Sequence, residues 1–93
     1  MTARRHIQSK RRSERFTFTH EGQTYQATIS RFPDGTLAEI FIDVNKPGSA
    51  LASIVSDCAV LVSLALQHGI SAAVIRHSIT GPVATAIDAV EAE

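Results

Sequence analysis

The chain has 93 residues, 44% of them hydrophobic, and its nine basic residues are balanced by nine acidic ones. This length suits one domain with a single modest core and little room for a deep substrate cavity, so we do not expect a self-sufficient enzyme. With one cysteine, no secretory signal and no apolar run long enough to span a bilayer, we expect a cytoplasmic protein without disulfides or a membrane partner.

The amino-terminal segment, residues 1–13, has no hydrophobic period and carries most of the positive charge. Six of the nine basic residues lie in the first fifteen positions, with one acid among them: Arg4, Arg5, Lys10, Arg11, Arg12 and Arg15. A tail of about +5 (six bases less one acid) therefore precedes a body of about −5 (three bases less eight acids). We expect a disordered arm that contacts either phosphates or an acidic protein partner. Nucleic-acid binding is kept as one alternative. Two features speak against it: the arm has no aromatic residue to stack on bases, and the acidic body repels a polyanion.

From residue 14 the pattern changes to the two-residue alternation of β-strands. Phe16 and Phe18 alternate with threonines, and a second run has apolar side chains at every other position, namely Tyr25, Ala27 and Ile29. The dipeptide 21–22 between the two runs predicts a tight hairpin turn. A turn at 32–36, with proline and glycine, leads to a third strand at 37–44. We therefore expect a three-stranded antiparallel meander, with Glu39 and Asp43 on the solvated face.

A long helix should follow the sheet, because the turn 45–48 breaks the third strand and Ser49 can cap a helix. Its apolar positions have helical spacing: Leu51, Ile54, Val55, Cys58, Val62, Ala65 and Leu66. We expect the polar positions to form a narrow stripe on the opposite side: Ser53, Ser56, Asp57, Ser63 and Gln67. Gly69 is expected to end the helix. Since a three-stranded sheet covers only one side of so apolar a helix, we expect the last helices or a second subunit, in a homodimer, to cover the rest.

Two short helices complete the predicted fold. The first runs over residues 71–79 with Val74 and Ile75 as its apolar contacts. The second runs over residues 83–92 and uses four apolar positions: Val83, Ala86, Ile87 and Val90. The sequence thus predicts one α+β domain over residues 14–93, in which a three-stranded antiparallel meander is followed by one long apolar helix and two short helices.

The turn before the long helix is the candidate binding site. It follows a strand and opens the longest helix, so its backbone N–H groups can converge at the positive end of the helix dipole. Lys46 would add a charge, and the residues of this anion site are Lys46, Gly48, Ser49 and Ala50. The alternative is structural, because Pro47 stops the strand, glycine makes the bend and serine caps the helix. The turn is not a P-loop, which needs a longer glycine-rich span.

We predict no catalytic residue, no metal ligand and no cofactor. Cys58 lies in the middle of the helix on its apolar side, and its neighbour Asp57 would raise the pKa of the thiol, which favours a packed core residue over a nucleophile. The four histidines have no zinc-ligand spacing: His6, His20, His68 and His77.

The segment 37–81 resembles the TSCPD-type domain, which occurs at the carboxyl end of adenosylcobalamin-dependent ribonucleotide reductases and as small standalone proteins. The resemblance, over about residues 15–82, rests on short runs: Glu39-Ile40-Phe41-Ile42, Lys46-Pro47-Gly48-Ser49, Leu64-Ala65-Leu66, Gly69-Ile70 and Ile79-Thr80-Gly81. The sequence lacks both the Thr-Ser-Cys-Pro-Asp motif and the paired cysteines of a reductase active site. The resemblance implies a non-catalytic accessory module and says nothing specific about its ligand, for which the turn before the long helix suggests a nucleotide or other anion. The alternative is an interaction protein, nucleic-acid-associated or an inhibitor of a larger complex, that acts through the basic arm and the acidic surface.

Overall fold

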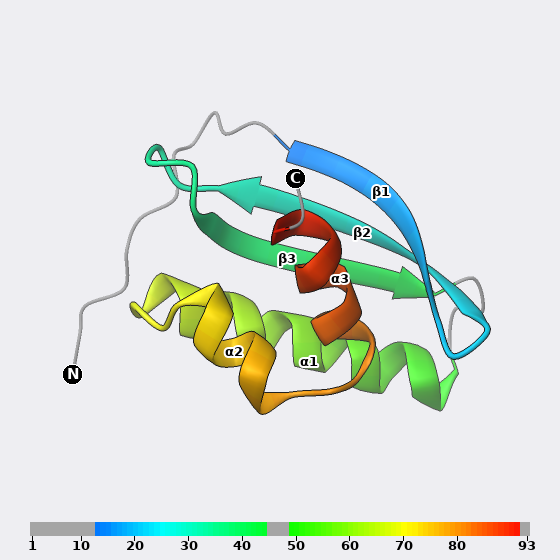
Figure 1. The fold of residues 1–93 in the computed structure, drawn as a ribbon. Helices are drawn as coiled ribbons and strands as arrows, with labels where there is room; N and C mark the ends of the chain where they lie inside the picture. Colours follow the sequence, from blue (N-terminus) through cyan, green and yellow to red (C-terminus); the bar gives the residue numbers. More distant parts are fainter. Residues whose placement is uncertain (1–12, 45–48, 92–93) are drawn as a thin grey trace.

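The computed structural model describes residues 13–44 and 49–91. In these ranges three strands are followed by three helices: β1 (Ser13–His20), β2 (Gln23–Arg31), β3 (Leu37–Val44), α1 (Ala50–Gln67), α2 (Ala72–Ser78) and α3 (Pro82–Glu91). As Figure 1 shows, the helices lie on one side of the sheet, with α1 along β3 and α3 against β1. The predicted α+β class and its order of elements are confirmed.

The sheet is an antiparallel meander in the order β1-β2-β3. Its first turn has only two residues, Glu21 and Gly22, between the paired residues His20 and Gln23. Both turn residues have positive φ angles, 49° and 79°. This is the backbone of a type I′ turn, which matches the twist of the flanking strands. The predicted hairpin is confirmed.

The turn between β2 and β3 closes through its own backbone. The N–H of Gly35 donates to the carbonyl of Phe32 at 2.9 Å, and the N–H of Phe32 donates to the carbonyl of Thr36 at 2.8 Å. Gly35 has a φ of 89°, which glycine adopts without steric penalty. Phe32 is only 4% exposed, so this turn also contributes an aromatic ring to the interior.

The core lies between the sheet and the helices. All four predicted positions of α3 are buried: Val83, Ala86, Ile87 and Val90. On α2, Ile75 is buried as predicted, but Val74 is 57% exposed, so the prediction for Val74 was wrong. A helix of seven residues that packs on α3 turns only one narrow side inward, and Val74 lies outside that side.

Both ends of α1 are closed by the residues that the sequence singled out. At its start the Ser49 hydroxyl accepts a hydrogen bond from the Ala52 N–H at 3.0 Å. At its end Gly69 has a φ of 96°, and its N–H donates to the carbonyl of Leu66 at 3.2 Å. The N–H of Ile70 donates to the carbonyl of Ala65 at 3.1 Å, which completes a Schellman motif.

Candidate functional site

The side of α1 that faces β3 carries two buried polar side chains. Ser63 is 5% exposed, and its hydroxyl accepts from the Ile40 N–H at 2.8 Å and donates to the Ile40 carbonyl at 2.9 Å. Gln67 is 2% exposed, and its Nε2 donates to the carbonyl of Ala38 at 3.2 Å. Because β3 is an edge strand, these side chains satisfy backbone groups that a further strand would otherwise pair.

This arrangement corrects the predicted polar stripe of α1. Ser53, Ser56 and Asp57 are exposed, as expected. Ser63 and Gln67 were expected beside them and are instead buried against the sheet, so that part of the prediction was wrong. The edge of β3 needs hydrogen-bond partners, and the last turns of α1 supply them.

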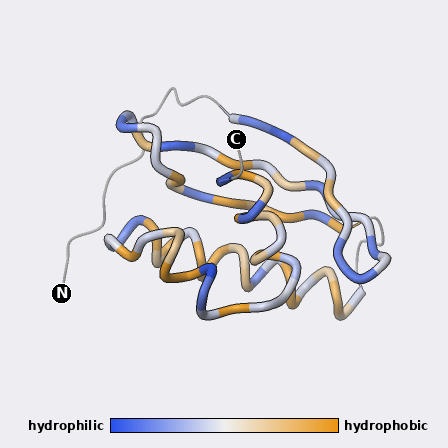
Figure 2. Tube along the Cα trace, in the orientation of Figure 1, coloured by the Kyte–Doolittle hydropathy of each residue, from blue (hydrophilic) through white to orange (hydrophobic). Residues whose placement is uncertain are grey.

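The outward side of α1 is apolar and exposed, and Figure 2 shows hydrophobic residues along the length of this helix. Five large side chains on it are between 37% and 68% exposed: Leu51, Ile54, Val60, Leu61 and Leu64. Leu51 and Ile54, two of the predicted apolar positions, lie on this exposed side. The sheet and α3 cover one side of α1, and the described part of the chain leaves the other side open.

By length and composition alone, α1 would also be able to cross a membrane, since its 18 residues are apolar enough for a span. Core helices of soluble proteins pass the same test, although only 33% of this helix is buried. The hydrogen bonds of Ser63 and Gln67 to β3 belong to a helix docked on a sheet, and a helix inserted in lipid would have to break them.

The predicted anion site lies only partly within the described residues. Lys46 and Gly48 lie outside them, while Ser49 and Ala50 stand at the start of α1. A hollow of about 440 Å³ beside the first turns of α1 is lined by two acidic residues, Asp43 and Asp57, along with neutral ones. These carboxylates oppose an anion, so the positive end of the helix dipole is partly offset here.

A cleft of about 640 Å³ opens between the β2–β3 turn, the end of α1, α2 and α3. Its apolar lining includes Leu37, Leu66 and Ile87, and its lining residues with acidic or basic side chains are Asp34, Arg76, His77, Asp88 and Glu91. No local sequence pattern predicts this cleft, because its walls come from four separate segments of the chain. Its size is within the range of small-molecule sites.

One ion pair crosses the wall of this cleft. Arg76 Nε donates to Asp88 Oδ1 at 2.6 Å, and the pair joins α2 to α3. The hydrogen bond lowers the pKa of the Asp88 carboxyl and raises the pKa of the Arg76 guanidinium, each relative to its ordinary value. The pair therefore stabilises the charged form of both side chains. This favours a structural role, in which the ion pair joins the two helices, over acid–base chemistry.

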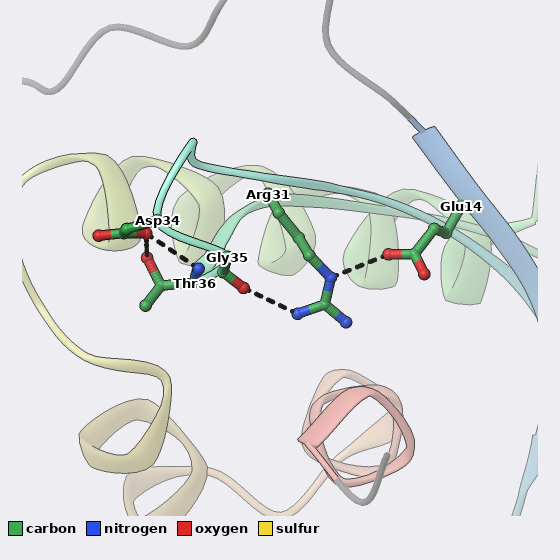
Figure 3. A network of polar contacts seen from close by, with 5 residues as sticks. All are labelled: Glu14, Arg31, Asp34, Gly35 and Thr36. Atoms are coloured by element: carbon green, nitrogen blue, oxygen red, sulfur yellow. Dashed lines mark hydrogen bonds and ion pairs between the residues drawn. The ribbon is translucent and has the colours of Figure 1, made fainter.

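A polar network holds the β2–β3 turn at the rim of the cleft (Figure 3). Arg31 Nε donates to Glu14 Oε2 at 2.9 Å, and its Nη1 donates to the carbonyl of Gly35 at 3.1 Å. Asp34 Oδ1 accepts from the N–H of Thr36 at 3.0 Å and from its hydroxyl at 2.6 Å. The turn is thus tied to β1 as well as to itself, which gives this rim a defined shape.

The chemically reactive side chains are in structural settings. Cys58 is half-buried against the core, and burial raises the pKa of its thiol, which disfavours the nucleophilic thiolate. His20 Nδ1 lies 2.8 Å from the Thr85 hydroxyl and links β1 to α3. Within the described ranges, no three histidine, cysteine or acidic side chains lie close enough together to hold a metal ion.

Glu39 is a further correction. It was expected on a solvated face with Asp43, and Asp43 is exposed, but Glu39 is only 6% exposed. Ser30, its pairing partner across the sheet, is 2% exposed. The alternation of residues along β3 predicts that Glu39 lies on the face of the sheet opposite to the core. It does not predict whether that face of the sheet is buried or exposed.

Of the basic residues assigned to the arm, only Arg15 lies within the described residues, exposed on β1. The other five, Arg4, Arg5, Lys10, Arg11 and Arg12, lie outside them. The first strand begins at Ser13, one residue before the expected domain boundary. The role of the arm stays a prediction.

The described residues form a small α+β module of three strands followed by three helices. The chain belongs to the TSCPD domain family, whose model matches residues 1–85. The match extends beyond the segment on which the resemblance was based and confirms it.

Curated relatives are vitamin B12-dependent ribonucleotide reductases. The chain is 36% identical over 69 residues to the enzyme of Bradyrhizobium diazoefficiens and 33% identical over 69 residues to that of Agrobacterium fabrum, and each match covers 64% of this chain. It is 35% identical over 54 residues, 58% of this chain, to the enzyme of Streptomyces coelicolor. The matches span only 5–6% of the length of these relatives. No solved structure matches the chain significantly.

Proposed function

We propose that this chain is a non-catalytic accessory module that acts by binding. The observation that carries the proposal is the extent of the match, which is confined to 5–6% of each reductase while covering most of this chain. The structural settings of Cys58, His20 and the Arg76–Asp88 pair support the same conclusion. A segment of this size in a much larger enzyme is consistent with an appendage that binds a ligand or a protein partner.

The first candidate ligand is a nucleotide or another anion at the amino end of α1. Ser49 engages the N–H groups of Ala52 and Ser53, so the N–H groups of Ala50 and Leu51 are the donors that an anion would use. Because Asp43 and Asp57 line the hollow nearby, Lys46 would have to supply the positive charge.

A backbone amide NMR titration of the full chain with ATP tests this candidate. We expect saturable shifts confined to residues 46–52, lost in Lys46→Ala and retained in the matched charge control Arg15→Ala. Arg15 is exposed on β1, at a distance in sequence from the turn. An absence of saturable shifts at millimolar ATP would overturn the anion site and leave the accessory role to protein contacts.

The second candidate is an interaction protein, and two observations favour it. One is the exposed apolar side of α1, and the other is the split of charge between the first fifteen positions and the rest of the chain. The partner class follows from the relatives, namely a B12-dependent ribonucleotide reductase.

The experiment for this candidate uses the Bradyrhizobium diazoefficiens reductase from which the segment matching this chain has been deleted. We expect the full chain to bind the truncated enzyme in trans in a surface-binding assay. A variant without residues 1–12 tests the arm, and it stops there because Ser13 begins β1. Full binding by that variant excludes the arm, and no binding by the full chain overturns this candidate. Binding of the full chain that does not weaken as salt is raised excludes a purely electrostatic contact.

A further inference from the structure

The exposed side of α1 has the residue spacing of a helix–helix seam. Leu51, Ile54, Cys58, Leu61 and Ala65 lie three, four, three and four residues apart. This spacing keeps one apolar stripe facing a second helix. Along the stripe, Ile54 and Leu61 are 68% and 65% exposed, whereas Cys58 and Ala65 are small and half-buried. Small residues between large ones leave shallow positions in which side chains of another helix fit.

The seam suits an uncharged partner. Asp57 is the only charged residue in the 18 residues of α1, and the helix has no lysine or arginine. Flanking charges are what usually select a particular partner and orientation at such seams. A partner with charges of either sign would lose hydration here without gaining an ion pair along most of the helix.

We propose that a second copy of this chain covers this seam, with the two α1 helices antiparallel about a two-fold axis near Cys58. Cys58 is the middle residue of the seam, so the antiparallel arrangement is self-complementary. It places Leu51 opposite the partner's Ala65, a large residue against a small one. It also brings Ile54 to within one residue of the level of the partner's Leu61, since the two lie four and three residues from Cys58, so the two most exposed side chains are buried close to each other.

The helix dipoles favour the antiparallel orientation. In a parallel pair both helix dipoles would point the same way, whereas in the antiparallel pair they oppose each other. The two Asp57 side chains lie on the same flank of the antiparallel pair, at its solvated edge, because Asp57 is one residue from Cys58 and exposed. This inference goes beyond the proposed function, because a dimer and a monomer are equally able to bind a nucleotide at the amino end of α1. A reductase that binds the exposed side of α1 would instead compete with the second copy.

The seam is short, which sets the expected affinity. From Leu51 to Ala65 it spans about 21 Å at 1.5 Å per residue, so it buries less than a standard interface of about 800 Å² per partner. We therefore expect a dissociation constant on the order of micromolar to tens of micromolar.

Sedimentation velocity on the full chain, from about 1 to about 500 μM, tests the dimer across that range. We expect the sedimentation coefficient to rise with concentration. Leu61→Asp should weaken association on the order of 100-fold or more and still fold, because Leu61 is 65% exposed in the monomer. Ser53→Asp is the matched control, since Ser53 is exposed on α1 away from the seam and should not change association.

Oxidation with diamide tests the orientation, because Cys58 is the one cysteine in the chain. Two Cys58 thiols near the axis would form one disulfide as diamide accepts two electrons and two protons. In a Cys58→Ser background, Ile54→Cys should not crosslink in the antiparallel pair, whereas it would in a parallel one. Crosslinking through Ile54→Cys, whether or not Cys58 also crosslinks, overturns the antiparallel arrangement. A chain that stays monomeric throughout, or that floats with phosphatidylcholine vesicles instead of dimerising, overturns the proposal.

Discussion

Each side of α1 departs in part from the usual distribution of polar and apolar residues, although four of its six buried residues are apolar and Ser53, Ser56 and Asp57 are exposed. The side against β3 buries the polar Ser63 and Gln67, each with hydrogen bonds to the strand. The outward side exposes Ile54 and Leu61 by about two thirds. An ordinary amphipathic helix on a globular protein does the opposite.

The difference has a physical cause on each side. An edge strand presents backbone N–H and C=O groups, and leaving one of them buried without a partner costs about 1–3 kcal/mol, so hydrogen-bonding side chains next to β3 are stabilising. On the outward side, the sheet and α3 are too small to wrap the helix. Burial on α1 therefore follows what the neighbouring element needs, and the outward side stays apolar and exposed.

The largest expected effect comes from deleting the same side chain on the two sides of α1. Leu66→Ala should lower the free energy of unfolding by about 2–5 kcal/mol, because Leu66 is 4% exposed within the core. Leu61→Ala should change it by less than about 0.5 kcal/mol at low micromolar concentration, because Leu61 is 65% exposed. Urea unfolding of both variants measures this, and equal losses would break the comparison.

The polar side of α1 is tested by Ser63→Val against Ser56→Val. Ser63→Val removes the hydroxyl that serves both the N–H and the carbonyl of Ile40, so we expect a loss of about 2–3 kcal/mol. Ser56 is exposed on the same helix, and its replacement should stay within about 0.5 kcal/mol. If chemical denaturation shows Ser63→Val to be as stable as the wild type, the serine is not needed at the edge of β3.

The end of α1 sharpens the comparison, because Gln67 reaches β3 only if the helix continues to that residue. Gly69→Ala should destabilise by about 1 kcal/mol, since a φ of 96° strains any residue with a Cβ atom. Gly81→Ala is the control, because a Cβ there meets nothing within 4 Å and its φ is not in the left-handed region. Thermal unfolding compares the two, and a shift of equal size would contradict the proposed role of the Schellman motif.

The smallest expected effect concerns the exposed ion pair between Arg76 and Asp88, in contrast to the buried hydrogen bonds of Ser63. The Arg76 hydrogen bond lowers the pKa of Asp88 in the folded protein, so its contribution is present above the unfolded pKa of about 4 and is lost as the pH falls through the folded value. The difference in melting temperature between wild type and Asp88→Asn should therefore be small at neutral pH and shrink below about pH 4. A difference that grows on acidification would show that the pair acts in another way.

Local chemistry made several features predictable. Glu21-Gly22, Ser49 and Gly69 each act through their own backbone or a neighbour within four residues, and all three are found where the sequence placed them. The buried positions of α3 were also predictable, because a single apolar stripe on a short helix has one way to face a core. The anion site and the arm stay predictions, since most of their residues lie outside the described ranges.

Other features depended on contacts between distant segments. Glu39 is buried although its strand alternates regularly, and Val74 is exposed although it follows helical spacing. The cleft of about 640 Å³ is formed by four segments, and the Arg31–Glu14 pair joins residues 17 positions apart. A pattern along one element has no information about what lies across from it.

The sequence by itself determined the order of the elements, the ends of α1 and the membership in the TSCPD family, because periodicity and caps act over a few residues. Only the tertiary structure decided which side of α1 turns inward. That choice depends on the edge of β3, whose backbone groups are not paired with a further strand, and the sequence of the helix alone does not show this. As a result, Ile54 and Leu61 are the exposed centre of the surface that we expect a second copy to bind.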